Sequence, residues 1–443
     1  MKDKVFYGFG SLSYSVISQT ISSFFMFFST SVLGLSGALV GLAIAISTVW
    51  DGVSDTFIGY ISDKKKLGKL GRRNGYMLIA SVGMAIFNLL LWCIPNSFGQ
   101  PIKFIWILFT LILLETFNTM FSTPYSALGN EIAKSYEDRT KVNAVSTVFN
   151  LIGIMIPSVL LVIFLPNTPE YPVGQLNPHG YVKISIVTSL ICFVFGILSS
   201  LFTIPKEKET DKCQEKLDFR NIFKNSFTAF KNKRLRSLII GYSLTSIATV
   251  FLCSVGLHFF TYSFFYSSKQ ITFLLLSLMF GTIVSQPLWV FIASKKKKKP
   301  ALIIGIITTI LAIFGVIFVY LFRIQIYNIS YVLMLIFVFC CGIGSGALYS
   351  LPTSMYGDEI TKISKKGSNM IATYTGSMTL AGNIASSVTQ LIVGVLLDVI
   401  HFDHSVQVQT LGVQTGLSLI LFIGVQVSLI IACSVFSNFN ENN

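Results

Sequence analysis

The feature that most constrains this chain is a series of long apolar segments separated by short polar ones. Each segment holds about 20 or more residues, the length that an α-helix needs to cross the hydrocarbon core of a bilayer. The twelve predicted spans cover residues 8–33, 36–61, 76–96, 102–127, 142–166, 183–204, 237–265, 270–293, 300–322, 330–355, 370–398 and 411–436. The sequence therefore predicts an all-α membrane protein with twelve transmembrane helices.

The composition agrees with a lipid environment. Of the 443 residues, 53% are hydrophobic and only 12% are charged. A soluble domain carries roughly a quarter charged residues. We therefore expect membrane lipid, and not water, to surround most of the fold.

The basic residues indicate an orientation in the membrane. Of 33 Lys and Arg residues, 29 fall in the termini and loops that lie on one side of the predicted bundle. The other four are in loops on the opposite side: Lys103, Lys183, Lys269 and Arg323. Because basic loops stay in the cytoplasm, we expect a multi-pass protein of the cell (inner) membrane with both termini cytoplasmic. Despite the net charge of +14, this distribution argues against a nucleic-acid partner.

The two halves of the chain repeat. The segment PYSALGNEIAK from Pro124 to Lys134 recurs as PTSMYGDEITK from Pro352 to Lys362, an offset of 228 residues. We expect an N-terminal six-helix bundle at 1–204, a cytoplasmic linker at 205–236 with an amphipathic surface helix, and a C-terminal six-helix bundle at 237–443. Two parallel six-helix repeats are the architecture of major facilitator transporters, with the substrate site between the halves. The alternative is a chance match between short helix ends.

Three acidic residues lie well inside predicted spans: Asp51, Asp55 and Glu115. A carboxylate at mid-bilayer costs about 2.5–3.5 kcal/mol, so such residues are usually functional. Asp51 and Asp55 are four residues apart and share one helical face. Two carboxylates this close repel each other, and a proton or a cation between them relieves the repulsion. No Lys or Arg lies well inside any span, since Lys103 and Lys183 stand at the ends of theirs. This favours Na⁺ or H⁺ over a structural salt bridge; the alternative is a solvated vestibule near the cytoplasmic end.

Other polar residues are candidates for binding a solute. Glu115, Thr119 and Ser122 form a stripe at i, i+4 and i+7, and their oxygens also suit an alkali cation. Further candidates on the first, fifth and eleventh spans are Ser15, Gln19, Thr147, Asn150 and Asn383. Each could equally form hydrogen bonds between packed helices, as Ser and Thr commonly do in membrane bundles.

A glycine-rich basic loop follows the second span. It runs from Gly59 through Asp63 and Gly71 to Arg72 and Arg73. The glycines allow a tight turn, and the arginines can bridge to neighbouring helices, so we interpret the loop as a conformational latch. The alternative, a solvated positive-inside loop, explains the charges but not the glycines or Asp63.

Several of these motifs resemble one transporter family. Tyr7-Gly-Phe-Gly10, Trp50-Asp51-Gly-Val-Ser-Asp55 and Gly71-Arg72-Arg73 are similar to the melibiose permeases, the glycoside–pentoside–hexuronide:cation symporters of the major facilitator superfamily. Glu131 and Glu359 fit the cytoplasmic loops of that family, and we count both among the latch residues. The resemblance covers most of the chain and is strongest over the first 140 residues. It implies that Asp51 and Asp55 bind the coupling cation, with Ser54 and Thr119 completing the site.

The sugar-binding positions of that family differ here. Its charged sugar ligands align with neutral residues at all four positions: Ser15, Ser122, Thr147 and Ala381. The resemblance therefore implies an intact coupling site without the anchors for a galactoside. The family is also similar to animal lysolipid symporters, which implies room for a less polar solute.

These observations predict a secondary active transporter. We expect a symporter that couples Na⁺ or H⁺ to a sugar-like or other small organic solute by alternating access, with a monomer sufficient for the mechanism. The alternative is a proton-coupled exporter of an amphipathic compound, peptide or drug. The sequence shows no nucleophile–base set, metal motif or cofactor loop, so neither an enzyme, a cofactor nor a metal other than Na⁺ is expected.

Overall fold

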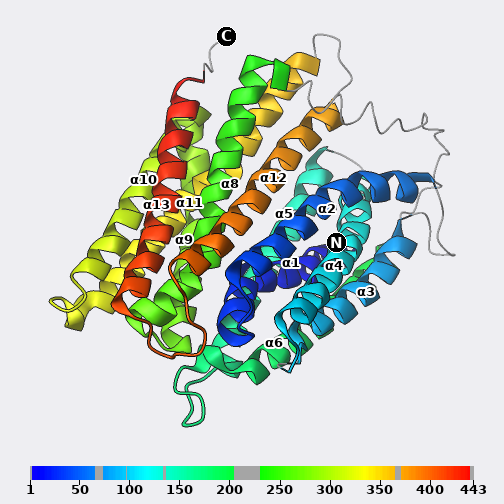
Figure 1. The fold of residues 1–443 in the computed structure, drawn as a ribbon. Helices are drawn as coiled ribbons and strands as arrows, with labels where there is room; N and C mark the ends of the chain where they lie inside the picture. Colours follow the sequence, from blue (N-terminus) through cyan, green and yellow to red (C-terminus); the bar gives the residue numbers. More distant parts are fainter. Residues whose placement is uncertain are drawn as a thin grey trace. The chain divides into compact units, whose positions relative to one another are not determined.

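The computed structural model describes residues 2–64, 73–95, 97–132, 136–203, 230–364 and 371–439. Within these ranges the chain forms twelve long helices and no strand; the helices are labelled in Figure 1. The helices are α1 (Lys2–Phe27), α2 (Gly37–Lys64), α3 (Asn74–Trp92), α4 (Gln100–Ile132), α5 (Tyr136–Phe164), α6 (Pro178–Phe202), α8 (Lys233–Phe264), α9 (Ser268–Lys296), α10 (Lys298–Leu321), α11 (Tyr327–Ser364), α12 (Ile371–Val399) and α13 (Leu411–Ser437). The predicted all-α class is confirmed.

Eleven of the described helices, α2 to α13, are long and apolar enough to cross a membrane. The first helix, α1, is as long but richer in serine, and it continues into a short π-helix, η1 (Phe28–Val32). It packs against α5 and α6, and its Ser11, Ser13 and Ser15 are buried. Because the serines of α1 meet protein instead of lipid, its lower hydropathy agrees with an interior position.

The chain divides into two compact units. Unit 1 comprises Met1–Lys216 with Asp403–Ser405, and unit 2 comprises Leu217–Phe402 with Val406–Asn443. In unit 1, α1 packs against α5 and α6, α3 against α4 and α6, and α2 against α4. In unit 2 the same pairings recur: α8 with α12 and α13, α10 with α11 and α13, and α9 with α11. This repetition agrees with the predicted six-helix pseudo-repeat; the predicted surface helix of the linker lies outside the described residues.

Small residues bring helices of one unit close together. Gly281 on α9 and Gly342 on α11 face each other, and a Cβ on Gly342 would overlap the carbonyl of Leu278. Glycine is favoured at such crossings because it lets two helix backbones approach. The α9–α11 contact therefore depends on the absence of a side chain at these positions.

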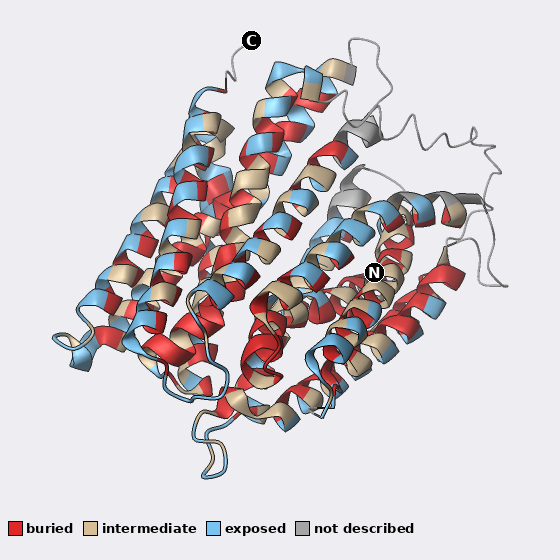
Figure 2. Ribbon diagram, viewed as in Figure 1, coloured by how far each residue is buried: buried red, intermediate tan, exposed pale blue. Residues whose placement is uncertain are grey.

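The outer faces of the helices are apolar. Figure 2 shows each helix striped with buried and exposed residues along its length. The exposed stripes carry large hydrophobic side chains, such as Phe280 on α9 and Leu311 on α10, which is 63% exposed. Such surfaces suit contact with acyl chains.

Candidate functional site

The candidate cation site lies where α2 packs against α4. The Thr119 hydroxyl of α4 donates to Asp51 Oδ1 of α2 at 2.8 Å. Ser54, also on α2, directs its hydroxyl to Thr119 Oγ1 at 3.1 Å and to the Asp51 carbonyl oxygen at 3.0 Å. Ser54 and Thr119 are buried, and Asp51 is partly buried. The structure thus brings three of the four predicted cation-site residues into one hydrogen-bonded network.

The fourth residue, Asp55, has a partner that the sequence analysis missed. Thr123 of α4 donates its hydroxyl to Asp55 Oδ1 at 3.2 Å, and the Thr119 hydroxyl also interacts with the Asp55 carboxylate. Two threonines four residues apart on α4 therefore face two aspartates four residues apart on α2. Because neighbouring helices share the same pitch, continuing the α4 stripe from i+4 to i+8 would have added Thr123 to the candidates.

Among the described residues, no basic side chain forms an ion pair with the acidic residues of this site. The charges of Asp51 and Asp55 act on each other, and both act on Glu115, which lies one turn from Thr119 on α4. The Oε2 atom of Glu115 accepts a hydrogen bond from the Asn118 amide at 3.2 Å. Among the residues that the structure describes, no ion pair joins any of the three carboxylates to Lys or Arg. Charges removed from water need a partner, which makes this cluster a candidate site for a cation or for protons.

A second contact fixes α2 against α4 beside the acidic cluster. Trp50 Nε1 donates to Thr116 Oγ1 at 2.8 Å, and the Thr116 hydroxyl donates to the Ile112 carbonyl oxygen at 2.7 Å. Further along α2, a Cβ on Gly59 would lie 3.4 Å from the Thr123 methyl group, which is ordinary van der Waals contact. Close packing against α4 therefore does not require the glycine at 59.

Two of the candidate substrate-binding residues meet at the α1–α5 interface. Ser15 is buried, and its hydroxyl donates to the Asn150 and Leu12 carbonyl oxygens, both at 3.3 Å. The Asn150 side chain is hydrogen-bonded to Tyr14. The Ser15 hydroxyl therefore forms hydrogen bonds between packed helices. This is one of the two roles, solute binding or helix packing, that the sequence analysis left open for Ser15.

The other candidates are more accessible and dispersed. Gln19 of α1 and Ser122 of α4 are partly buried, and the Gln19 amide donates to Ser23 Oγ at 2.7 Å. Thr147 of α5 is exposed, with its hydroxyl on the Asn143 carbonyl at 2.9 Å. Asn383 lies partly buried on α12 of unit 2. Their assignment to a substrate site remains a prediction.

The predicted latch residues contribute to a group of ion pairs that we call the charged end of unit 1. Arg73 precedes α3 and contacts Glu131 at the end of α4, with 2.9 Å between Nη2 and Oε1. Lys4 of α1 pairs with Asp138 of α5. The side chain of Asp63, and Gly71 and Arg72, lie outside the described residues. The described part of the latch therefore ties helices of one unit together.

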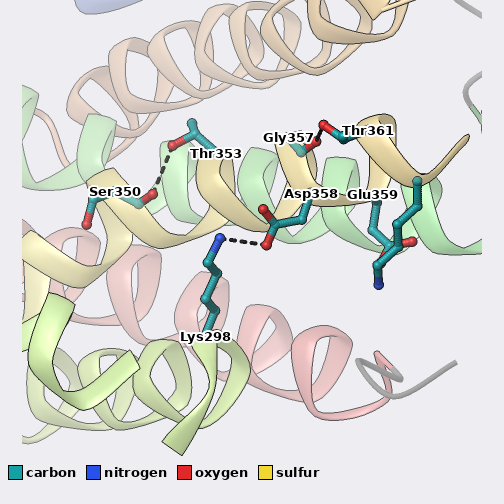
Figure 3. Close-up of polar contacts among 8 residues, drawn as sticks. Lys298, Ser350, Thr353, Gly357, Asp358, Glu359 and Thr361 are labelled. Carbon is teal, nitrogen blue, oxygen red and sulfur yellow. Dashed lines mark hydrogen bonds and ion pairs between the residues drawn. The ribbon is translucent and has the colours of Figure 1, made fainter. Parts of the chain in front are cut away.

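Unit 2 has a corresponding charged end. Glu359 of α11 is buried and contacts Lys362 at 2.7 Å and Arg234 of α8 at 3.6 Å. The neighbouring residue, Asp358, pairs with Lys298 at the start of α10, with 2.6 Å between Oδ2 and Nζ. Figure 3 shows Lys298 extending from α10 to Asp358 on α11. Sequence analysis selected Glu359 but not the Lys298–Asp358 pair.

Comparison with known proteins gives the family. The family described as MFS/sugar transport protein matches residues 6–440. An uncharacterised symporter of Synechocystis sp. is 28% identical over 190 residues, 42% of this chain and 35% of the relative. A Bacillus subtilis relative, also an uncharacterised symporter, is 26% identical over 267 residues, 59% of this chain and 55% of the relative. The matches thus span about a third and about half of these relatives.

A more extensive match is to the sodium-dependent lysophosphatidylcholine symporter 1-B of Danio rerio, 21% identical over 379 residues, 81% of this chain and 70% of the relative. Among solved structures, the nucleoside transporter NupG is similar with a TM-score of 0.69 at 14% identity, over 100% of this chain and 100% of that one. A D-xylose-proton symporter is similar with a TM-score of 0.65 at 13% identity, over 97% and 96%. These structures agree in fold. The chain belongs to the MFS/sugar transport protein family.

Proposed function

We propose that this transporter is a Na⁺-coupled symporter of a small organic solute, with the cation held between α2 and α4 by Asp51 and Asp55. The observation that carries the proposal is the matched arrangement of two aspartates and two threonines across this helix pair. Carboxylate and hydroxyl oxygens are hard ligands that suit an alkali cation. A sodium ion would replace the hydroxyl protons as the partner of the carboxylates.

The electrostatics of the cluster suggest how binding drives the cycle. Asp51 and Asp55 of α2 and Glu115 of α4 concentrate acidic charge, and no ion pair with Lys or Arg joins them among the described residues. Binding one Na⁺ screens the repulsion between the aspartates and stabilises the conformation in which they lie close together. One elementary charge that moves down a potential of about 100 mV supplies roughly 2.3 kcal/mol. This energy is available to accumulate the solute by alternating access.

The solute class follows from what the candidate residues offer. Ser122, Thr147, Gln19 and Asn150 present neutral donors and acceptors on α1, α4 and α5. Such groups suit hydroxyl-bearing or zwitterionic solutes, including glycosides and lysolipids. The sodium dependence of a relative that matches 81% of this chain supports Na⁺ as the first cation to test.

The orientation proposed for the transporter places both termini in the cytoplasm. The support is the distribution of Lys and Arg, of which 29 of 33 lie on one side of the helix order. Basic loops are retained on the cytoplasmic side during insertion. The charged ends of both units would then face the cytoplasm.

Thermal unfolding of the purified protein tests the proposed function. A ligand that binds the native state raises the melting temperature by mass action. The melting temperature is measured with glycosides, lysophospholipids and short peptides, each in NaCl and in choline chloride at equal ionic strength. We expect one solute class to stabilise the protein, and to stabilise it more in NaCl. If NaCl has no effect and only cationic amphiphiles stabilise the protein, symport is refuted in favour of proton-coupled export.

A further inference from the structure

A pair of adjacent residues stands at the start of the third helix of each unit. In unit 1 these are Arg73, directly before α3, and Asn74, its first residue. In unit 2 they are Lys298 and Lys299, the first two residues of α10. The first member of each pair contacts an acid at the end of the next helix, α4 or α11. The second member contacts a different helix.

Asn74 caps the end of α6. Its side chain is 1% exposed, and Nδ2 donates to the Ser200 carbonyl oxygen at 2.7 Å and to that of Thr203 at 3.1 Å. Thr203 directly follows α6. The last carbonyl groups of a helix have no partner within it, so one buried amide satisfies two of them.

Lys299 caps the end of α13 in the same way. Its Nζ donates to the Ser437 carbonyl oxygen at 2.6 Å and to that of Phe439 at 2.7 Å. The positive charge also interacts favourably with the negative end of the helix dipole. An amide in unit 1 and an ammonium group in unit 2 thus occupy the same structural position, which residue identity alone does not reveal.

We propose that these two residue pairs, Arg73–Asn74 and Lys298–Lys299, act as clasps that join the ends of the third, fourth and sixth helices of each unit. Asn74 and Lys299 are positioning residues: they make the three helices move as one body during the cycle. In unit 1 the clasped helix α4 carries Thr119 and Thr123. The clasp therefore transmits a change at the candidate cation site to the end of α6.

In unit 1 the second residue of the clasp, Asn74, carries most of its effect. The ion pairs are partly exposed, and the Asp358 side chain is 55% exposed. Exposed ion pairs contribute little because water screens them. Losing Asn74 would instead leave two buried carbonyl groups without a donor, which costs considerably more.

Hydrogen exchange on the purified full chain tests the contact in unit 1. Replacing Asn74→Ala should raise the exchange rate of the amides at the end of α6 about tenfold, because the last turn opens more readily. The matched control is Asn88→Ala, since Asn88 is buried on the same helix and donates to Thr188 and Ser189 of α6 at 3.1 and 2.8 Å. This control should leave the end of α6 at the wild-type rate. Wild-type exchange in the Asn74 variant, or equal acceleration in the Asn88 variant, would overturn the proposal.

The same measurement applies to unit 2. Lys299→Met should accelerate exchange at the end of α13, and Lys299→Arg, which keeps the donors, should restore the wild-type rate. Lys296→Met is the control, because Lys296 is an exposed residue of the same lysine run. Acceleration by the Lys296 variant, or none by Lys299→Met, would contradict the assignment.

A sodium titration distinguishes two roles of Asn74: coupling α6 to the candidate cation site, or only capping the end of α6. This experiment rests on the proposed function. In the wild type, NaCl should slow exchange at the end of α6 relative to choline chloride. In the Asn74→Ala variant, NaCl should still raise the melting temperature, with an unchanged Na⁺ midpoint. It should no longer slow hydrogen exchange at the end of α6. In the Asn88→Ala variant, NaCl should still slow that exchange. Protection that persists in the Asn74 variant overturns the positioning role. Failure of the proposed function is distinguishable, because NaCl would then leave the wild-type melting temperature unchanged.

Discussion

Replacing Thr119 by valine removes one hydroxyl group from the α2–α4 network and nearly preserves the shape of the side chain. That hydroxyl donates to Asp51 Oδ1 at 2.8 Å and accepts from Ser54 at 3.1 Å. With Na⁺ bound, we expect the Thr119 oxygen to be a ligand of the ion. We take the loss of this ligand to cost about as much as a hydrogen bond to a charged group, about 1.5–3 kcal/mol. Because about 1.4 kcal/mol corresponds to a tenfold change in affinity, Na⁺ binding should weaken about 10- to 100-fold.

The assay is the melting temperature of purified protein over a series of NaCl concentrations, from which the Na⁺ midpoint is obtained. Thr116→Val is the matched control, because Thr116 also bridges α4 to α2 but through the neutral indole of Trp50. It should lower the melting temperature without moving the Na⁺ midpoint, and Thr119→Ser should largely restore that midpoint. An unchanged midpoint in Thr119→Val, or an equal displacement in Thr116→Val, would refute the reasoning.

Three further substitutions test the site and the packing of the helices. Thr123→Val should raise the Na⁺ midpoint less than Thr119→Val does, because Thr123 makes a single, longer hydrogen bond to Asp55 at 3.2 Å; the same titration measures it. Gly10→Ala should destabilise the protein by about 1–3 kcal/mol, since a methyl group there would overlap the Tyr125 ring. Gly256→Ala in α8, where a Cβ meets nothing within 4 Å, should instead stabilise the protein by about 0.5–1 kcal/mol in the same unfolding assay.

The helix positions could be predicted because apolar run length is a direct requirement of the bilayer. The predicted span 411–436 corresponds to α13 (Leu411–Ser437), and 300–322 corresponds to α10 (Lys298–Leu321). A predicted span ends too early where the helix continues beyond the apolar run. The span 330–355 corresponds to α11, which extends to Ser364, because polar residues such as Asp358 and Glu359 are compatible with a helix although not with lipid.

The acidic pair of the candidate site was predictable, but its partners were only partly so. Charge inside a span singles out Asp51 and Asp55 in the sequence alone. Which hydroxyls face them depends on how α4 is rotated against α2, and spacing does not determine that rotation. For this reason the predicted stripe included Ser122 and missed Thr123, whose hydroxyl contacts Asp55.

Charge alone also assigned to loops three basic residues that lie in helices: Lys103 in α4, Lys183 in α6 and Lys269 in α9. The sequence analysis assigned Lys103 to an external loop, whereas the structure places it in the first turn of α4 with 8% exposure. Its Nζ donates to the Leu33 carbonyl oxygen at 2.7 Å, and Gln100 donates to the Gly34 carbonyl oxygen at 2.6 Å. These side chains satisfy carbonyl groups at the turn between η1 and α2, a tertiary contact that loop charge cannot indicate.

The most direct test of the central claim is equilibrium binding of radioactive ²²Na⁺ to the purified wild type, to Asp51→Asn and to Thr116→Val. The account predicts saturable binding of one Na⁺ per chain in the wild type and in the Thr116 control. It predicts that Asp51→Asn, which removes a carboxylate charge from the network with Ser54 and Thr119, loses this binding while remaining folded. Wild-type Na⁺ binding by Asp51→Asn would contradict the assignment of the cation site.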